Sequence, residues 1–531
     1  MMSKLRRFHP FLFVIIPILN VMARNPGGAT LGDVLVLSLA MLVACGLVYA
    51  VVALALRHRA EKEAVPLLVV FAVILFYAYP TFRAAYNGAR GDPGRLATTG
   101  GIVVAVMIAA LAGMWWLARR PALLNRANTF LGIMGLLVVG FLGARVFADQ
   151  LRARSQVRSS VLAKRLAQPI PNRGGDTKPL PDIYIVILDE YANSSVLRER
   201  FGFDNRAFED SLRHLGFTIP TLVRSNYAHT LLSLPSLLNF AYLTDLTKEL
   251  GPRQTDPTLP NHLVENNRTI FFLKDRGYRI AFFPSQWWIS TERSRHADVQ
   301  FRAWEGFHLG RAATRSDLRR AFVSRTPLAL LQRGDRHDAD HVQRTLTGLA
   351  ALTRDSSPTF ALAHVLNPHY PYVFDADCRV HAKRPARKWG QGREQDYVEQ
   401  LQCLNHLLLG TVTRLLQDPR AEPIILLVGD HGTNALGYNN ASQAEDVSPD
   451  QARERLGAFA AFRLPRGVKV DVPDSVTLVN LVPTLLNSYF DTHLPVHPDS
   501  LYMSLEKTPY LFAPVDPIAL TRRCPAGGCS H

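Results

Sequence analysis

The sequence predicts an α/β protein with an N-terminal bundle of about five transmembrane helices and then a domain built on a mainly parallel central sheet. Two observations predict this fold class. The long apolar runs lie almost entirely before residue 150, although hydrophobic residues make up 48% of all 531 residues. Beyond residue 180, short β-branched runs alternate with helical stretches, which is typical of parallel strands covered by helices on both faces.

The first part of the chain contains the candidate membrane spans. Several of its apolar runs reach the roughly 20 residues that a helix needs to cross the hydrocarbon layer, whereas the first and third are short and could be re-entrant or buried. The first run also resembles a signal peptide in its basic N-terminal flank, but no small-residue cleavage site follows cleanly, so we favour an uncleaved helix. The runs are Pro10 to Val21, Leu31 to Leu56, Val65 to Tyr79, Gly101 to Leu117 and Thr129 to Phe147.

The basic residues predict the orientation of these spans. Clusters of Lys and Arg precede the first run and separate the second from the third and the fourth from the fifth. Cytoplasmic flanks carry such clusters, so an odd number of spans places the chain after residue 150 outside the cytoplasm. The loop on the opposite side contains Arg83, Arg90 and Arg95, so the bias of basic residues toward the cytoplasmic side is imperfect.

Net charge and cysteine content narrow the class of protein. The formal net charge of +16 is compatible with binding to nucleic acid or to anionic lipid, and with basic residues that set membrane topology. Basic residues are not interleaved with aromatic ones, so no nucleic-acid partner is expected. Four cysteines in the external part favour disulfides over a zinc site. Of the three possible pairings we expect Cys378 with Cys403 and Cys524 with Cys529.

The predicted division of the chain has four parts: a transmembrane domain at 1–150, a linker at 151–180 that begins as a basic helical stretch and ends rich in turn formers, an external domain at 181–515 and a tail at 516–531. The strands and helices expected in the external domain follow from the buried β-branched runs and the stretches between them. The strands are Ile183 to Leu188, Ile280 to Phe283, Phe360 to Val365, Ile424 to Val428 and Ala458 to Leu464, and the helices are Ala207 to Leu215, Thr269 to Arg276 and Tyr397 to Leu416.

Acidic and imidazole side chains follow two of these strands. Asp189 and Glu190 come after the first strand, and Asp430 and His431 come after the strand at 424–428. Open parallel sheets bind ligands beyond the carboxyl ends of their strands. Carboxylate and imidazole groups suit zinc or manganese. Either pair alone is weak evidence, because an acidic residue after a strand is often a helix cap.

Two further segments carry possible chemistry. Thr230 opens an apolar helical stretch, and a helix N-terminus suits a phosphate or sulfate group. A metal ion can activate such a hydroxyl as a nucleophile; the alternative is a plain N-cap. In the segment HVLNPHYPY, prolines flank His369, which could hydrogen-bond a substrate oxyanion or protonate a leaving group. His364, within the strand, is expected to be structural.

In this order, the motifs ILDEY, TLLSLPS, HVLNPHYPY and GDHG resemble the sulfatase-like branch of the alkaline phosphatase superfamily, over roughly Pro181 to Phe512. Phosphoethanolamine transferases, lipoteichoic acid synthase and arylsulfatases are its relatives, and the transferases share the layout of membrane helices before such a domain. The resemblance implies an alkaline-phosphatase-like fold for the external domain.

The resemblance also implies roles for individual residues. Thr230 matches the transferase nucleophile, with Ser233 and Pro235 at the spacing of a TxxSxP pattern. His369 matches a histidine near the substrate phosphate. The remaining candidates are Asp189, Asp430 and His431 as metal ligands, Glu190 as a possible further ligand, and Asn226 for substrate binding.

The function implied by the resemblance is that of a membrane-anchored transferase using one divalent metal ion, zinc or manganese. It would move a phosphoethanolamine or phosphoglycerol group from a phospholipid donor to an envelope glycan or lipid acceptor, through a phospho-threonine intermediate. The expected location is the bacterial inner membrane, multi-pass, with the catalytic domain in the periplasm.

The sequence departs from these families in two places. Sulfatases carry a cysteine or serine followed by an arginine where this chain has Thr230, which counts against ordinary sulfate-ester hydrolysis. The transferases carry a further histidine after the late DHG, and GDHGTNALGYNNASQ has none, which puts a second metal in doubt. Two alternatives therefore stay open: a hydrolase of sulfate or phosphate esters, and a non-catalytic relative that binds a partner or glycan.

Overall fold

The structure is a computed structural model. It describes residues 2–25, 27, 31–57, 64–89, 93–170, 179–285, 291, 294–301, 317–331, 334–352, 357–381, 393–417, 422–518 and 520. The chain forms two compact units: Met1–Ser155 with Phe307–Gln332, and Gln156–Gly306 with Arg333–His531.

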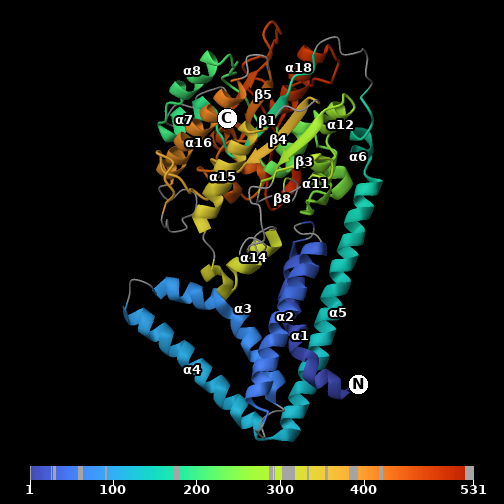
Figure 1. The fold of residues 1–531 in the computed structure, drawn as a ribbon, viewed down its shortest axis with the longest axis vertical. Helices are drawn as coiled ribbons and strands as arrows, with labels where there is room; N and C mark the ends of the chain where they lie inside the picture. Colours follow the sequence, from blue (N-terminus) through green and yellow to red (C-terminus); the bar gives the residue numbers. More distant parts are fainter. Residues whose placement is uncertain are drawn as a thin grey trace. The chain divides into compact units, whose positions relative to one another are not determined.

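Long apolar helices make up most of the first unit (Figure 1). Within the described residues, five of them are long and apolar enough to cross a membrane, as the sequence predicted. The first and third candidate spans, Leu5–Arg24 and Val65–Gly88, are longer than their apolar runs, because helix-compatible polar residues extend them. The helices are α1 (Met2–Arg24), α2 (Leu31–Ala55), α3 (Val65–Ala89), α4 (Pro93–Ala118) and α5 (Pro121–Ser159).

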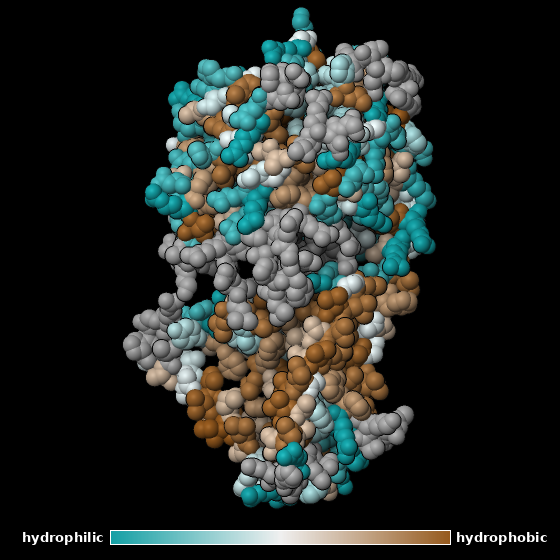
Figure 2. All heavy atoms as spheres, viewed as in Figure 1, coloured by the Kyte–Doolittle hydropathy of each residue, from teal (hydrophilic) through white to brown (hydrophobic). Residues whose placement is uncertain are grey.

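The outer surface of these helices is apolar. Leu35, Val51 and Phe141 are each more than two-thirds exposed, at 68%, 67% and 67%. On the face that Figure 2 shows, hydrophobic residues cover much of this unit, and hydrophilic residues predominate over the other unit. A surface of this extent is typical of helices that face lipid.

A segment from the middle of the chain also belongs to the first unit. Helix α14 (Asp317–Ser324) is followed by the 3₁₀ helix η3 (Pro327–Leu331). Leu318 and Phe322 of α14 pack into a core with Ile18 of α1, and Arg319 pairs with Asp33 of α2 at 3.1 Å. The predicted division places this segment within residues 181–515.

A six-stranded sheet organises the second unit, with the order β3-β2-β4-β1-β5-β6. Its strand pairs are parallel apart from β5 with β6, so the predicted mainly parallel sheet is confirmed. The strands are β1 (Ile183–Leu188), β2 (Arg279–Phe283), β3 (Val299–Gln300), β4 (Thr359–Val365), β5 (Ile424–Gly429) and β6 (Ala460–Arg463), and a separate hairpin contains β7 (Leu501–Leu505) and β8 (Thr508–Val515).

Helices cover both faces of the sheet. Each face has its own hydrophobic core, because successive side chains of a strand point to opposite faces. In β1, Ile183, Ile185 and Ile187 enter one core, and Tyr184, Val186 and Leu188 enter the other. The first core includes α9 (Thr230–Asn239), α12 (Arg268–Lys274) and α18 (Leu478–Phe490), and the second includes α7 (Ser194–Phe201), α8 (Arg206–His214), α15 (Gly334–Ala350) and α16 (Glu394–Leu415).

The remaining short helices lie around this framework. Residues of α6, α10 and α11 form a smaller core with the β7–β8 hairpin, and α17 joins another with the same hairpin. Their bounds are α6 (Val161–Leu166), α10 (Leu246–Leu250), α11 (Thr258–Glu265), α17 (Pro449–Leu456), η4 (Tyr438–Asn440) and η5 (Ala444–Asp446).

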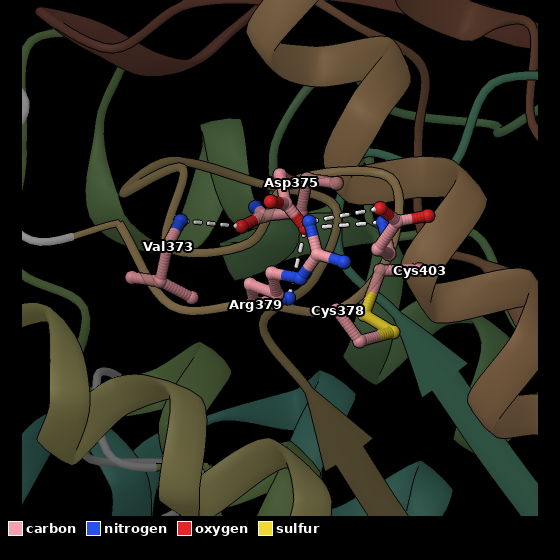
Figure 3. Close-up of a disulfide and its surroundings, with 7 residues drawn as sticks. Val373, Asp375, Cys378, Arg379 and Cys403 are labelled. Atoms are coloured by element: carbon pink, nitrogen blue, oxygen red, sulfur yellow. Dashed lines mark hydrogen bonds and ion pairs between the residues drawn. A yellow bond between two sulfur atoms is a disulfide. The ribbon is translucent and has the colours of Figure 1, made fainter.

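A disulfide joins the loop after β4 to helix α16 (Figure 3). It links Cys378 to Cys403, which are 25 residues apart, and this predicted pairing is confirmed. Asp375 supports the loop, since its Oδ1 accepts hydrogen bonds from the backbone N–H groups of Asp377 and Arg379 at 3.0 and 2.8 Å. The other predicted pair, Cys524 with Cys529, lies outside the described residues.

Removing this disulfide is expected to destabilise the second unit. Because the bridge closes a loop of moderate length, the Cys378→Ser/Cys403→Ser variant should lose about 3 kcal/mol of unfolding free energy. Thermal unfolding should show the loss, and a reducing agent should lower the midpoint of the wild-type protein similarly. The matched control is Cys45→Ser, which changes a free cysteine and should stay sensitive to the reducing agent. An unchanged midpoint in the double variant would contradict a stabilising role.

Candidate active site

Strand register brings three chain segments to one edge of the sheet. Leu188, the last residue of β1, pairs with Val365 of β4 and with Gly429 of β5. The residues that follow the three strands therefore leave the sheet side by side. Two backbone hydrogen bonds fix the arrangement: Asp189 N–H donates to Val365 O at 3.0 Å, and His369 N–H donates to Asp189 O at 3.1 Å.

Asp189, Asp430 and His431 form one buried group at this edge. Each offers a ligand atom, and these atoms all lie within 4.8 Å of one another. His431 Nε2 is 3.1 Å from Asp430 Oδ2 and 3.9 Å from Asp189 Oδ1. The structure thus brings together the three residues that the sequence singled out as metal ligands.

The protonation of His431 favours a shared cation. Its Nδ1 lies 3.0 Å from Gly432 O, so we assign the proton to Nδ1, which leaves a lone pair on Nε2. Burial and the positive charge of Arg455 hold the pKa of the imidazole well below 6.5, so the ring is neutral. Two lone-pair atoms, His431 Nε2 and Asp430 Oδ2, therefore face each other, an arrangement that a bound cation stabilises.

Asp430 is fixed by one oxygen and offers the other. Its Oδ1 accepts hydrogen bonds from the N–H groups of Glu190 and His431, at 3.1 and 2.9 Å. Among the described residues Oδ2 accepts no hydrogen bond. Burial raises the pKa of Asp430 to about 6, although the hydrogen bond from Glu190 N–H and the positive charge of Arg455 oppose this rise. Two carboxylates, one imidazole and an adjacent hydroxyl are a donor set that fits zinc or manganese.

Thr230 lies directly beside this group. Its Oγ1 is 3.0 Å from His431 Nε2, and it is the first residue of α9. His229 occupies the N-cap position, so the alternative interpretation of Thr230 as the cap is wrong. The His229 ring lies 2.8 Å from Ser504 O through Nε2 and 3.1 Å from the Tyr438 hydroxyl through Nδ1. These contacts hold the residue that precedes the hydroxyl.

The glycines of the GDHG motif are required by close packing. A Cβ at Gly432 would collide with the backbone carbonyl of Glu454, and one at Gly429 would collide with the carbonyl of Tyr191. These carbonyls belong to backbone segments packed against the motif, so neither can move away as a flexible side chain does. Glycine therefore lets the chain on both sides of Asp430 and His431 come close to its neighbours.

Replacing Gly432 with alanine is expected to disturb the site through this collision. Overpacking of this kind costs about 1–3 kcal/mol, and here it should also weaken metal binding because His431 is the preceding residue. The matched control is Gly410→Ala in α16, where an added Cβ meets nothing within 4 Å, so helix propensity should stabilise that variant slightly. Thermal unfolding and zinc titration of both variants test this, and equal behaviour would contradict it.

Other predicted site residues lie around the group. The His369 side chain is half-buried and its Nδ1 contacts Tyr370 O. His364, which was expected to be structural, lies close to the site, because its Nε2 is 3.8 Å from Asp189 Oδ2. Its Nδ1 lies 3.0 Å from Thr291 Oγ1.

Glu190 and Asn226 have other partners. The Glu190 carboxylate pairs with Arg455 at 2.8 Å and is outside the three-residue group. The Asn226 amide donates to Ser500 O at 3.0 Å, and its Oδ1 accepts from Val479 N–H at 2.8 Å. These contacts leave substrate binding by Asn226 without support in the structure, and they indicate that it joins backbone segments instead.

The sequence did not identify Glu454 and Arg455 of α17. Glu454 accepts hydrogen bonds from the Thr433 hydroxyl and from two backbone N–H groups, Ala435 at 2.6 Å and Leu436 at 2.8 Å, and so holds the loop after GDHG. Arg455 is buried beside His431, with Nη2 and Nε2 3.2 Å apart. The one available signal was a pair of adjacent opposite charges in a short polar helix, which is common on protein surfaces.

Comparison with known proteins gives structural matches. No protein-family model and no curated protein matches the chain. The C-terminal periplasmic domain of EcEptC from Escherichia coli, in complex with Zn, matches with 12% identity and a TM-score of 0.45 over 65% of this chain and 96% of that one.

Two other solved structures represent the two kinds of enzyme whose motifs the sequence resembles. The periplasmic domain of phosphoethanolamine transferase EptC from Campylobacter jejuni matches with 12% identity and a TM-score of 0.36, over 59% of this chain and 90% of that one. BT1596, a 2-O GAG sulfatase, matches with 14% identity and a TM-score of 0.39, over 60% and 72%.

Proposed function

We propose that this chain is a membrane-anchored, metal-dependent transferase that moves a phosphoethanolamine or phosphoglycerol group from a phospholipid to an envelope glycan or lipid. The observation that carries the proposal is the 3.0 Å approach of Thr230 Oγ1 to His431 Nε2, within a buried group of three potential metal ligands. A hydroxyl placed at a helix N-terminus beside such a group is suited to nucleophilic attack on an anionic phosphodiester.

Each residue has a role in the proposed reaction. A zinc or manganese ion held by Asp189, Asp430 and His431 would lower the pKa of the hydroxyl and offset charge on the phosphoryl oxygens. Thr230 Oγ1 loses its proton to solvent and attacks phosphorus, the P–O bond to diacylglycerol breaks, and His369 gives a proton to the departing oxygen. In the second step an acceptor hydroxyl gives its proton to His369 and displaces Thr230 Oγ1, which takes a proton from solvent.

The membrane helices support this reaction by confining the domain to the surface that contains its donor. Tethering raises the effective donor concentration without any further contact. In this proposal the protein is in the bacterial inner membrane, with the catalytic domain in the periplasm. That location also suits the Cys378–Cys403 disulfide, because disulfides persist in oxidising compartments.

The same residues would also serve a hydrolase, in which water replaces the acceptor. Threonine at the nucleophile position distinguishes the chain from sulfatases and favours the phosphoryl reaction. The retained ligand group counts against a non-catalytic relative, because three converging buried ligands are costly to keep without a cation.

Incubation of the purified full-length protein with vesicles containing labelled phosphatidylethanolamine or phosphatidylglycerol tests the proposal. Intact-mass analysis should find one headgroup phosphate on Thr230, and an added envelope-lipid acceptor should become labelled. Labelled headgroup released without labelled acceptor would favour the hydrolase. Absence of both adduct and turnover in zinc- or manganese-loaded protein would contradict either reaction.

A further inference from the structure

A buried arginine connects the segments that bear the candidate ligands and nucleophile. Arg455 lies near the end of α17 and is 6% exposed. Its guanidinium has one partner in each of three segments: the carbonyl of Ala228, two residues before Thr230; the carbonyl of Gly432, next to His431; and the carboxylate of Glu190, next to Asp189.

These contacts fix the guanidinium in one orientation. Nε donates to Ala228 O at 2.6 Å, while Nη1 donates to Gly432 O at 2.9 Å and to Glu190 Oε1 at 2.8 Å. Nη2 therefore points along the remaining direction of the planar fork. Its partner there is His431 Nε2 at 3.2 Å, the same nitrogen that lies 3.0 Å from Thr230 Oγ1.

The partner of Nη2 would change if a metal ion occupied the site. A nitrogen that binds a metal ion has no lone pair left, so His431 Nε2 would no longer accept from Arg455. A buried guanidinium N–H left without an acceptor is costly. An anionic oxygen beside Thr230 would supply that acceptor, and arginine is well suited to phosphate.

Glu190 is placed as the counter-ion of this arginine. Its backbone is held at φ 60°, a left-handed conformation that is costly for a residue other than glycine. Hydrogen bonds at both of its peptide groups maintain it: Glu190 N–H donates to Asp430 Oδ1 at 3.1 Å, and the Tyr397 hydroxyl donates to Glu190 O at 2.9 Å. In this conformation the carboxylate pairs with Nη1 of Arg455 and not with Nη2.

We propose that Arg455 binds a non-bridging oxygen of the phosphoryl group that reacts at Thr230, and that Glu190 is the counter-ion that positions it. Arg455 then provides a fixed positive charge in a chain whose GDHG segment lacks the further histidine of the transferases. The inference rests on the proposed function in using the same site, but anion binding can be measured without turnover.

Binding of inorganic phosphate to the zinc-loaded full-length protein tests this inference. Equilibrium dialysis with labelled phosphate gives the affinity, and elemental analysis gives the zinc content of each variant. Arg455→Met, which preserves length without charge, should bind phosphate at least about tenfold more weakly with zinc retained, since hydrogen bonds between charged groups are of that strength. Arg455→Lys, which keeps the charge but loses the fork, should lie between the two.

Glu190→Gln tests the counter-ion role with the opposite sign. Glutamine still accepts from Nη1 but removes the negative charge, so phosphate should bind several-fold more tightly with zinc unchanged. Loss of zinc in this variant would place Glu190 among the ligands and overturn its role, as would unchanged phosphate affinity. Wild-type phosphate affinity in a zinc-loaded Arg455→Met protein would overturn the role of Arg455. If Arg455→Met does not fold, Arg455→Lys decides, and wild-type affinity there would overturn the role of the directed Nη2 hydrogen bond.

These outcomes separate the inference from the proposed function. The lipid experiment reports headgroup transfer to Thr230, whereas phosphate dialysis reports anion binding beside it. Weak phosphate binding by the Arg455 variants together with no lipid adduct would support the anion site and contradict the transferase. A lipid adduct together with unchanged phosphate binding would support the transferase and contradict the role of Arg455.

Discussion

Replacing Thr230 with alanine is expected to lower transfer from a phospholipid donor by about 10⁴-fold or more, the scale of loss seen when a covalent nucleophile is removed. The reason is that Thr230 Oγ1, which lies 3.0 Å from His431 Nε2, is the attacking oxygen in the proposed reaction. Labelled-headgroup transfer to an acceptor measures the loss. Thermal unfolding and zinc content should remain near their wild-type values.

The matched variant for this prediction is Thr230→Ser, which keeps the hydroxyl and removes only a methyl group. It should retain a substantial share of turnover and form the same covalent adduct. Wild-type turnover by Thr230→Ala would exclude a covalent role. Loss of turnover in both variants with the zinc lost would instead assign Thr230 to metal binding.

Replacing Asp430 with asparagine is expected to have two opposite effects. Zinc binding should be lost, because a ligand with a negative charge is removed. The metal-free protein should nevertheless become more stable at pH 7, by about 1–3 kcal/mol. Asparagine can keep the contacts of Oδ1 while its new N–H group donates to His431 Nε2, which is 3.1 Å from Oδ2.

The pH dependence of the metal-free wild-type protein should show the same effect. Burial raises the folded-state pKa of Asp430 from 3.8 to about 6, so the folded state binds this proton more tightly than the unfolded state does. Its contribution to stability is therefore present below pH 4 and is lost as the pH rises toward about 6. Melting curves at pH 5 and 7, with chelator and with zinc, measure it.

The control for this prediction is Asp446→Asn, at an exposed residue. Its metal-free stability should change equally little at both pH values, and its zinc binding should be unaffected. If metal-free Asp430→Asn were less stable than the wild type at pH 7, burial of the Asp430 carboxylate would not destabilise the metal-free protein.

The strands and the ligand group could be predicted because they depend on local patterns. Continuous apolar runs such as Ile183–Leu188 are strands buried on both faces, and their carboxyl ends must meet at one edge in a parallel sheet. Asp189 and Asp430 follow paired residues of β1 and β5, so the placement of the two carboxylates needed only the strand order.

Features that depend on distant contacts could not be predicted in the same way. Arg455 lies in a short helix of mostly polar residues, and no local pattern distinguishes it from an exposed arginine. Its burial arises from three segments that meet around it. Asn226 was expected to contact substrate, but its partners Val479 and Ser500 are more than 250 residues away in sequence. Helix α14 packs against the long apolar helices of the first unit, although its polar residues resemble those of a surface helix.

The central claim is that one metal ion is bound by Asp189, Asp430 and His431 with Thr230 beside it. Anomalous diffraction at the zinc edge, from crystals of the zinc-loaded protein, tests it most directly. We predict a single peak at this edge of the sheet, at about 2.0–2.2 Å from one atom of each of the three ligands, with the Thr230 hydroxyl next to it. A zinc peak elsewhere, with these three residues metal-free, would contradict the account.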